Sequence, residues 1–382
     1  MFVYGIFEVL YSPSKIFKEI AKDPKYTGPL LILMLFLASN LGFVYAQLTK
    51  INIEKTMPKD PSLDSWTEDS SMWKPEGCVN STDRIYGNSS IQCSSNETKI
   101  WMQLDLPENV NCSKEEGFKN MSIRVKWICS SESKVTNATL YLFSDSGYFY
   151  LNLTKMISNT SNIWYNITVP LGSENEWEKT GNPDWQNITR LKIDVEVLNQ
   201  SENAKLTLRI DGLFFRGAYE PLTNYAFSYL MNFSLAFIVQ FVFLWIIFGT
   251  MLYALIRYAG GDILWKVSFI SAGYVLITSF IQGLFNTAII FTLPQISYPI
   301  EVIAPAKSEA GIAEEILSNI NSKISFTYQA MDAFAIVIYA FGALLSTFAV
   351  RSLTDFSWKK SLIIGASTYI TSIFLTKLLI GI

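Results

Sequence analysis

Long apolar runs dominate the hydrophobic pattern of this chain. The longest, residues 226–255, exceeds the about 20 residues that cross a bilayer core. A short charged turn follows, in which Gly260 and Gly261 allow the backbone to reverse, and a second apolar run then continues to Leu293. The pattern predicts two membrane-spanning helices folded back on each other around this turn.

Three further apolar runs lie at residues 30–45, 328–350 and 361–382. We expect the first to be an uncleaved anchor, because Val44-Tyr45-Ala46 has a small residue at only one of the two positions that determine signal-peptide cleavage. The expected segments are an amphipathic cytoplasmic arm (1–27), a first transmembrane helix (28–47), a glycosylated extracellular β-sandwich with two disulfides (48–221), a second and a third transmembrane helix (222–255 and 262–293), an extracellular connection with an amphipathic helix (294–327), and a fourth and a fifth transmembrane helix (328–350 and 357–382).

The N-terminal arm has its own helical pattern. Ser12 and Pro13 form a helix-start signature, with Ser12 as the cap. Ile16, Phe17 and Ile20 then share one face of the helix, opposite a face of lysines. We expect this helix to lie in the membrane interface.

Basic residues predict the orientation, because they concentrate on the cytoplasmic side of membrane proteins. The arm and both short turns carry them, so we expect a multi-pass protein of the cell membrane with a cytoplasmic N-terminus and with the large domain and the C-terminus outside. The residues concerned are Lys15, Lys18, Lys22, Lys25, Arg257, Lys266, Arg351, Lys359 and Lys360.

Between residues 48 and 221 the pattern changes from apolar runs to short alternating segments separated by Gly, Pro, Asn and Ser. Such segments predict an antiparallel sandwich of seven or eight strands. The predicted strands are 100–106, 121–129, 138–143, 148–153, 163–169, 191–197 and 206–215. The expected fold class is therefore a membrane α-helical bundle of five transmembrane helices with an all-β extracellular sandwich, a jelly roll, inserted between the first and second spans.

This polar region also carries the marks of an oxidising, extracellular compartment. All four cysteines lie in it, which predicts two disulfides with three possible connectivities among Cys78, Cys93, Cys112 and Cys129. Sequons for N-linked glycans occur at Asn80, Asn88, Asn96, Asn111, Asn120, Asn137, Asn152, Asn159, Asn166, Asn187 and Asn199.

Composition narrows the possible functions further. Mean hydropathy is +0.24 and the chain has no histidine, which removes the commonest general base and the usual zinc ligand. There is no phosphate-binding loop and no basic arm for nucleic acid. We expect a protein that is not an enzyme and that holds no metal and no cofactor other than its glycans.

Segments late in the polar region resemble the closing strands of galactose-binding-type jelly rolls. The resemblance rests on Trp164–Leu171, Trp177, Gly181–Trp185 and Leu208–Phe215. It implies a sugar site in loops at one end, with Trp177 and Trp185 as stacking residues, and a calcium ion near the domain ends, with Asp211 as a ligand. The alternative is that both tryptophans belong to the core or its rim.

The membrane portion resembles the Yip-domain family of archaeal type. The resemblance rests on five spans, the Ser12–Phe17 arm, the turn Ala254–Gly261 before Phe269, and Leu353–Lys360 before the last span. For eukaryotic members it implies vesicle traffic and contact with small GTPases. This chain has a shorter arm and a domain between spans one and two, as expected of an archaeal cell-surface protein.

Polar residues within the spans are candidates for function, because they are costly there. Gln282 and Asn286 share one face of the third span, and Asp332 and Lys377 lie at similar depth in the fourth and fifth. We expect Asp332 and Lys377 to pair beside the two amides around a small polar cavity. The alternative is that these groups join the helices or reach the interface.

Three functions agree with these patterns. The first is a non-catalytic scaffold or accessory subunit that presents the sandwich and binds other membrane or cell-surface proteins. The second is a carbohydrate-binding receptor at the cell surface. The third is a transporter of small solutes or lipid, which the absence of inverted repeats disfavours. Expected partners are such proteins, membrane lipid and carbohydrate, but not nucleic acid.

Overall fold

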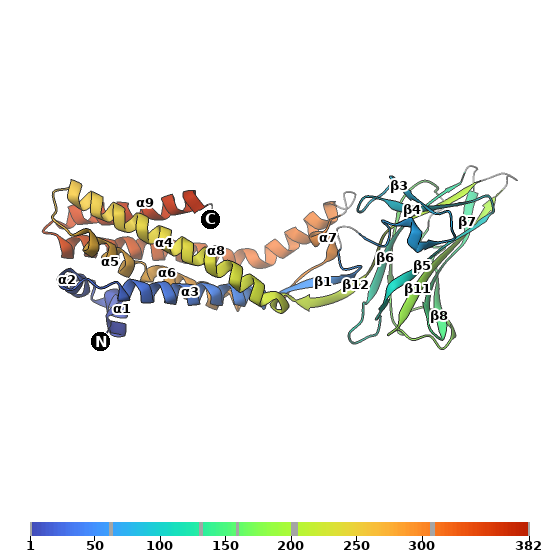
Figure 1. Ribbon diagram of the computed structural model, residues 1–382, viewed down its shortest axis with the longest axis horizontal. Coiled ribbons are helices and arrows are strands. Elements are labelled where there is room, and N and C mark those ends of the chain that lie inside the picture. The colour runs from blue at the N-terminus through green and yellow to red at the C-terminus, as the bar shows by residue number, and fades with distance from the viewer. Residues whose placement is uncertain are drawn as a thin grey trace. The chain divides into compact units, whose positions relative to one another are not determined.

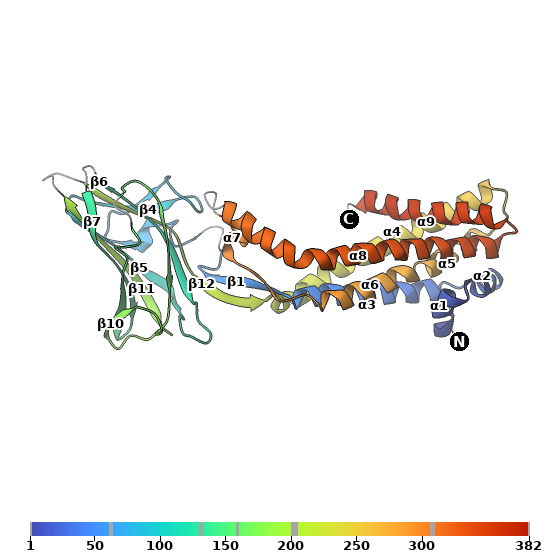
Figure 2. The ribbon, with the colours of Figure 1, turned by 180° about the vertical axis from the view of Figure 1, so that it is seen from behind.

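The computed structural model describes residues 2–60, 64–129, 133–157, 160–199, 205–305 and 310–380. The chain divides into two compact units. The first comprises Met1–Ile51, Pro221–Ile296 and Ile320–Ile382, and the second comprises Asn52–Glu220 and Ser297–Asn319. The first unit is helical and the second is mainly β-structure (Figures 1 and 2).

The helical unit is built from the apolar runs of the sequence. Five helical stretches among the described residues are long and apolar enough to cross a membrane: 27–48, 222–258, 265–290, 311–353 and 358–380. The helices are α1 (Phe2–Tyr11), α2 (Pro13–Lys22), α3 (Thr27–Leu48), α4 (Ala226–Tyr258), α5 (Trp265–Val275), α6 (Ile277–Ile290), α8 (Ala310–Leu353) and α9 (Trp358–Ile380).

Small residues let these helices approach closely, as is common where apolar surfaces alone give no specificity. A Cβ atom built on Gly365 of α9 would lie 2.6 Å from the backbone nitrogen of Thr347 in α8. A Cβ on Gly342 of α8 would lie 2.2 Å from the ring of Tyr369 in α9. Helices α8 and α9 therefore lie side by side, as Figure 2 shows.

The predicted turn between the second and third spans is present. Helix α4 ends at Tyr258, and Gly260 takes a positive φ of 87°, which residues with a side chain rarely adopt. The Arg257 guanidinium lies 2.5 Å from the Asp262 carboxylate across the turn. The glycines thus allow the reversal that the sequence predicted.

The N-terminal arm packs against the rest of the helical unit, and its position in the membrane interface stays a prediction. Pro13 does begin α2, but the side chain of Ser12 forms no capping hydrogen bond. The apolar face of α2 is covered by protein, since Ile16, Phe17 and Ile20 are all buried in the core of the helical unit. The three apolar residues that share one face of α2 therefore contribute to the core of the helical unit.

The connection after the third span also differs from expectation. The predicted amphipathic helix and the predicted fourth span form one continuous helix, α8, from Ala310 to Leu353. Residues 310–353 contain no proline, and their two glycines are Gly311, in the first turn, and Gly342. Nothing in this stretch therefore interrupts the backbone hydrogen bonds.

The β-unit consists of two antiparallel sheets, shown in Figures 1 and 2. Seven of its strands coincide with the seven predicted from alternation. The strands are β1 (Ile51–Met57), β2 (Trp73–Lys74), β3 (Val79–Ser81), β4 (Ser90–Ser95), β5 (Lys99–Val110), β6 (Asn120–Cys129), β7 (Ser133–Ser144), β8 (Gly147–Asn152), β9 (Tyr165–Pro170), β10 (Glu178–Gly181), β11 (Ile188–Asn199), β12 (Leu206–Pro221) and β13 (Ile296–Tyr298), and a short helix α7 (Ile300–Ile303) follows.

One sheet has seven strands, in which β12 pairs with both β4 and β6, and β6 pairs with β9. The other has six, in the order β10-β8-β7-β11-β5-β2. Alternate residues of each strand face the core between the sheets, such as Leu140 and Leu142 of β7 and Leu191 and Ile193 of β11. The intervening residues form the two outer faces.

The expectation of two disulfides is half correct. Cys78 and Cys93 form one, but Cys112 and Cys129 are thiols. Cys112 lies near the first end of β6, because the Phe118 amide bonds the carbonyl of the residue before Cys112, whereas Cys129 is the last residue of that strand. Ten residues at about 3.3 Å each place the two strand ends about 30 Å apart, beyond the reach of a disulfide.

Candidate functional site

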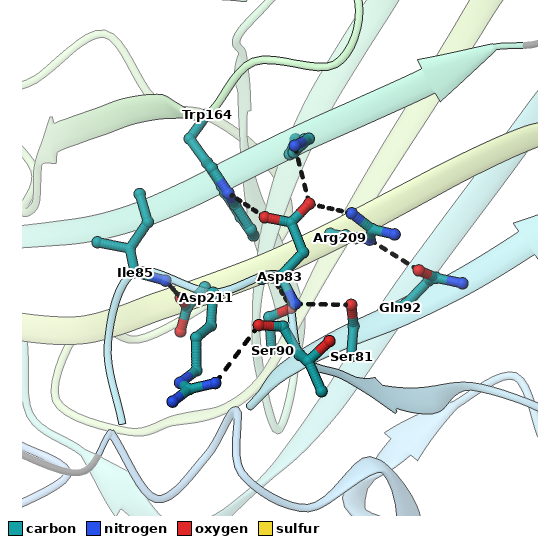
Figure 3. Close-up of polar contacts among 11 residues, drawn as sticks. Ser81, Asp83, Ile85, Ser90, Gln92, Trp164, Arg209 and Asp211 are labelled. Atoms are coloured by element: carbon teal, nitrogen blue, oxygen red, sulfur yellow. Dashed lines mark hydrogen bonds and ion pairs between the residues drawn. The ribbon is translucent and has the colours of Figure 1, made fainter. Parts of the chain in front are cut away.

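On the outer face of the seven-stranded sheet, the loop of residues 82–89 is bonded to side chains of β6 and β12 (Figure 3). The Asp83 carboxylate accepts hydrogen bonds from the indole of Trp164 at 3.2 Å and from the ammonium of Lys126 at 2.8 Å, and it pairs with Arg209. Burial alone would raise the pKa of Asp83, but the bonds from Lys126 and Trp164 hold it below the ordinary value. The loop is thereby fastened across these strands.

Asp211 of β12 also binds this loop, through hydrogen bonds from two of its backbone amides. Its carboxylate accepts from the backbone amides of Ile85 and Tyr86, the latter at 3.0 Å, and from its neighbour Gly212 at 2.8 Å and the Thr67 hydroxyl at 3.3 Å. These donors occupy the oxygens that a calcium ion would need. Across the described residues, no three His, Cys, Asp or Glu side chains gather into a metal site.

The outer face of the six-stranded sheet is different, because aromatic side chains lie there half-buried or exposed. We call it the aromatic face and define it by the outward side chains of this sheet. Its rings are Trp101 on β5, Tyr141 and Phe143 on β7, and Tyr148 and Tyr150 on β8. None of them belongs to the sandwich core.

Strand register places these residues in three rows across the sheet. One row reads Glu178, Tyr150, Tyr141, Lys192, Gln103 and Lys74. The next reads Thr180, Tyr148, Phe143, Arg190 and Asp105. The last reads Asn152, Thr139, Asp194 and Trp101. From β8 to β5 the face spans three inter-strand gaps, or about 14 Å.

The rings form a continuous cluster. Tyr141 lies 5.8 Å from Tyr148 and 6.2 Å from Tyr150, measured between ring centres. The Lys192 ammonium lies 5.4 Å from the centres of both Trp101 and Tyr141 and so links the tryptophan to the tyrosines. Trp101 is 36% exposed, so its ring remains accessible.

Charged groups on this face are paired with each other. Asp105 contacts Lys74 at 2.7 Å and Arg190 at 2.6 Å, and the bonds from Lys74 and Arg190 hold the pKa of Asp105 below its ordinary value. Lys192 lies 2.9 Å from the carboxylate of Asp194. The Tyr150 hydroxyl donates to Glu178, which raises the pKa of that tyrosine. The three rows thus hold three cations and three carboxylates, and Lys99 of β5 also lies 3.9 Å from the carboxylate of Asp194.

The two tryptophans predicted to stack on sugar lie together elsewhere in the sandwich. Trp185 stacks face to face on Phe149 with ring centres 3.9 Å apart, and Trp177 meets Trp185 edge-on at 5.5 Å. The Trp177 indole donates to the Pro170 carbonyl at 2.7 Å. Both pack against the core, as the alternative interpretation held. Sugar stacking by either residue stays a prediction.

Sequence reasoning passed over the aromatic face, although a signal was present. Tyr141 and Phe143 are two residues apart, as are Tyr148 and Tyr150. Alternate residues of a strand point to the same side, so two such pairs on neighbouring strands place four rings on one face. The sequence alone does not show which side of the sheet faces the core.

The predicted glycosylation sites are accessible wherever the structure describes them. The asparagines of the sequons are exposed or half-buried at Asn80, Asn88, Asn96, Asn111, Asn120, Asn137, Asn152, Asn166 and Asn187. Asn159 and the side chain of Asn199 lie outside the described residues. Asn152 stands at the margin of the aromatic face, opposite Thr139.

In the helical unit, three of the four predicted polar residues come together. Gln282, Asn286 and Lys377 line one pocket, which Asp332 does not line. Asp332 precedes Tyr339, the α8 residue in the pocket, by seven positions, or about 10 Å along the helix. In the part of the chain that the structure describes, Asp332 and Lys377 form no ion pair, so the expected pairing is not observed.

No family model matches the chain, and no curated protein matches it either, so the Yip-domain resemblance stays an expectation. Among solved structures, a family 11 carbohydrate-binding module from Clostridium thermocellum in complex with a β-1,3-1,4-mixed-linked tetrasaccharide aligns with 43% of this chain and 96% of its own, at 14% identity and a TM-score of 0.29. A non-crystalline cellulose-specific module, CBM28, aligns with 41% of this chain and 93% of its own, at 12% identity and a TM-score of 0.27.

Proposed function

We propose that this chain is a membrane-anchored carbohydrate-binding protein whose sandwich binds a neutral glycan on the aromatic face. One observation carries the proposal: five aromatic side chains lie together on one accessible sheet face, outside the core and bordered by hydrogen-bonding groups. The five apolar helices supply the anchor.

The chemistry of the aromatic face suits a sugar. A sugar ring presents apolar C–H groups on its faces and hydroxyls on its rim, and aromatic rings offer a flat apolar surface that stays favourable beside water. Tyr141 and Tyr150 would stack on ring faces. Gln103, Asp105 and Arg190 would exchange hydrogen bonds with hydroxyls, because together they supply donors and acceptors.

The charge balance of the aromatic face favours a neutral ligand. Lys74, Arg190 and Lys192 are matched by Asp105, Asp194 and Glu178, all within the same rows. An acidic polysaccharide would gain no net attraction from a surface without net charge, so its charge would not contribute to binding. A neutral polysaccharide needs no such attraction.

Location and orientation belong to the same proposal. The disulfide between Cys78 and Cys93 supports an oxidising environment for the sandwich. The predicted sequons and the basic turns support an extracellular sandwich and a cytoplasmic N-terminus. The scaffold or accessory role stays a prediction of the sequence. Purification from native membranes in mild detergent tests it, because an accessory subunit should co-purify with other membrane subunits at a fixed ratio.

The test measures binding of the full chain, solubilised in mild detergent, to a panel of soluble neutral and acidic polysaccharides by isothermal titration. We expect binding to at least one neutral glucan or galactan. Tyr141→Ala and Tyr150→Ala should each raise its Kd about tenfold, the effect expected for loss of one stacking contact with its buried area.

The matched control is Tyr219→Ala, which removes a tyrosine that is 46% exposed on β12, away from the aromatic face. It should leave the Kd within about twofold. Trp177→Ala tests the alternative location directly. Loss of binding in Trp177→Ala with full binding in Tyr141→Ala and Tyr150→Ala would refute the aromatic face as the site.

A further inference from the structure

The helical unit encloses a polar pocket of about 280 Å³. Five helices line it: α3, α4, α6, α8 and α9. Four carboxamide side chains reach it from three of these helices, namely Asn40, Gln240, Gln282 and Asn286. Each contributing helix belongs to a stretch that is long and apolar enough to span a membrane, with α6 forming one such stretch together with α5, and polar groups are costly there unless they have a use.

The walls of this pocket are held by contacts between helices. Gly283 of α6 lies against α3, where a Cβ atom would approach the Ser39 hydroxyl oxygen to 2.4 Å. The Thr287 hydroxyl of α6 donates to the Ser39 carbonyl at 3.0 Å. On the other side, Tyr369 of α9 and Thr278 share a hydrogen bond of 3.0 Å. The pocket is thus part of a packed arrangement.

The polar groups that line the pocket carry positive charge but no negative charge among the described residues. Of the lining residues that the structure describes, Lys377 is the one with a charged side chain and none has a carboxylate side chain. The Lys377 ammonium lies 5.7 Å from the centre of the Tyr339 ring. The amide oxygen of Asn286 is buried without a hydrogen-bond partner in the part of the chain that the structure describes. The pocket therefore offers a cation and an unused hydrogen-bonding group.

The remaining lining is apolar. Phe36, Phe241, Leu244, Ile373 and Ile380 supply hydrocarbon surface next to the amides. Lys377 is exposed and lies three residues before the end of α9, so it marks the open side of the pocket. A ligand that enters there meets a cation at the rim, amides further in, and apolar walls beside them.

We propose that this pocket binds the headgroup of an anionic phospholipid, with the phosphate on Lys377 and a headgroup hydroxyl on the Asn286 oxygen. An ammonium and a phosphate form a charge-assisted hydrogen bond. The volume lies just below the usual range for ligand pockets, which suits a headgroup alone, while the acyl chains remain in the bilayer along the apolar helices. The site is separate from the aromatic face.

The experiment uses the full chain, purified in neutral detergent and delipidated, then titrated with phosphatidylglycerol or phosphatidylcholine and observed by native mass spectrometry. Phosphatidylglycerol has a net negative charge and free hydroxyls, whereas phosphatidylcholine has neither. We expect phosphatidylglycerol to bind about tenfold more tightly, and Lys377→Met to abolish that difference.

Lys359→Met is the matched control, because it removes a cation from the opposite end of the same helix, outside the pocket. It should retain the preference for phosphatidylglycerol. Asn286→Leu removes the amide oxygen without changing the charge of the pocket. It should weaken phosphatidylglycerol binding and leave phosphatidylcholine binding unchanged. It also serves as the test if Lys377→Met does not fold.

Inorganic phosphate distinguishes the two sources of the anion. We expect millimolar phosphate not to displace phosphatidylglycerol, because the apolar walls contribute only to lipid binding. Displacement by phosphate that depends on Lys377 would overturn the lipid proposal in favour of a free anion. Equal binding of both lipids to the unmodified chain, or an unchanged preference in both Lys377→Met and Asn286→Leu, would overturn the site altogether.

Discussion

Replacing Arg216 with methionine should strongly destabilise the β-unit. The guanidinium contacts Glu54 at 2.9 and 3.0 Å and Glu301 at 2.5 and 2.8 Å, bidentate in both cases. Burial alone would lower the pKa of Arg216, but the bonds to Glu301 and Glu54 raise it above its ordinary value. Burial would in turn raise the pKa of Glu301, but the bond from Arg216 holds it below its ordinary value.

The magnitude follows from what the substitution leaves behind. The side chain of Glu54 is only 2% exposed and that of Arg216 is 12% exposed, so Arg216→Met leaves a buried carboxylate without its cation. Breaking a buried pair in this way costs about 3–5 kcal/mol. Glu54 keeps hydrogen bonds from the amides of Gly217 and Ile300, both at 2.7 Å, which favours the lower end, about 3 kcal/mol. In a unit of this size that lowers Tm by about 6–12 °C.

The assay is thermal unfolding of the full chain in detergent, followed by tryptophan fluorescence, since the β-unit holds most of the tryptophans. Arg190→Met is the control, because its ion pair with Asp105 is 45% exposed on both sides and should contribute no more than about 1 kcal/mol. Adding Glu54→Leu to Arg216→Met should restore part of the stability. The reasoning fails if Arg216→Met costs no more than Arg190→Met.

Two further predictions concern buried positions. Burial raises the pKa of Asp64 well above 3.8, so its stabilising contribution is full below that pH and is lost as the pH rises towards the folded pKa. Asp64→Asn should therefore stabilise the β-unit at pH 7 and much less at pH 3.5. Equal effects on thermal unfolding at both pH values would contradict this. In the helical unit, Gly283→Ala should lower the free energy of unfolding by about 1–3 kcal/mol, because the new Cβ would overlap Ser39. Gly42→Ala is the control and should be tolerated, since its Cβ would keep 3.7 Å from Thr287. If both variants lose the same fraction of folded protein on heating, the close approach at Gly283 is contradicted.

Much of the architecture follows from local patterns in the sequence. Apolar runs of the required length predict the helices at 226–255 and 328–350, and alternation predicts the seven strands, because both depend on the repeat of one element alone. The turn at Gly260 is equally local, since a positive φ excludes most other residues. The amphipathic face of the arm was also visible, although the surface that covers it was not.

The candidate sites depend on register between elements, which a single sequence does not contain. Cys78 pairs with Cys93 because β3 and β4 are neighbours, while the length of β6 separates Cys112 from Cys129. In the helical unit, Lys377 comes level with Tyr339 and not with Asp332, through the alignment of α8 and α9.

The aromatic face shows the same division. The spacing of Tyr141 and Phe143 in the sequence determines that they share one side of β7, and that of Tyr148 and Tyr150 does so for β8. Only the packing of the two sheets decides that this side faces outward, because the core takes the opposite side, with Leu140 and Leu142. Local repeats select the elements, and burial, which involves residues far apart in the sequence, selects the surface that remains for a ligand.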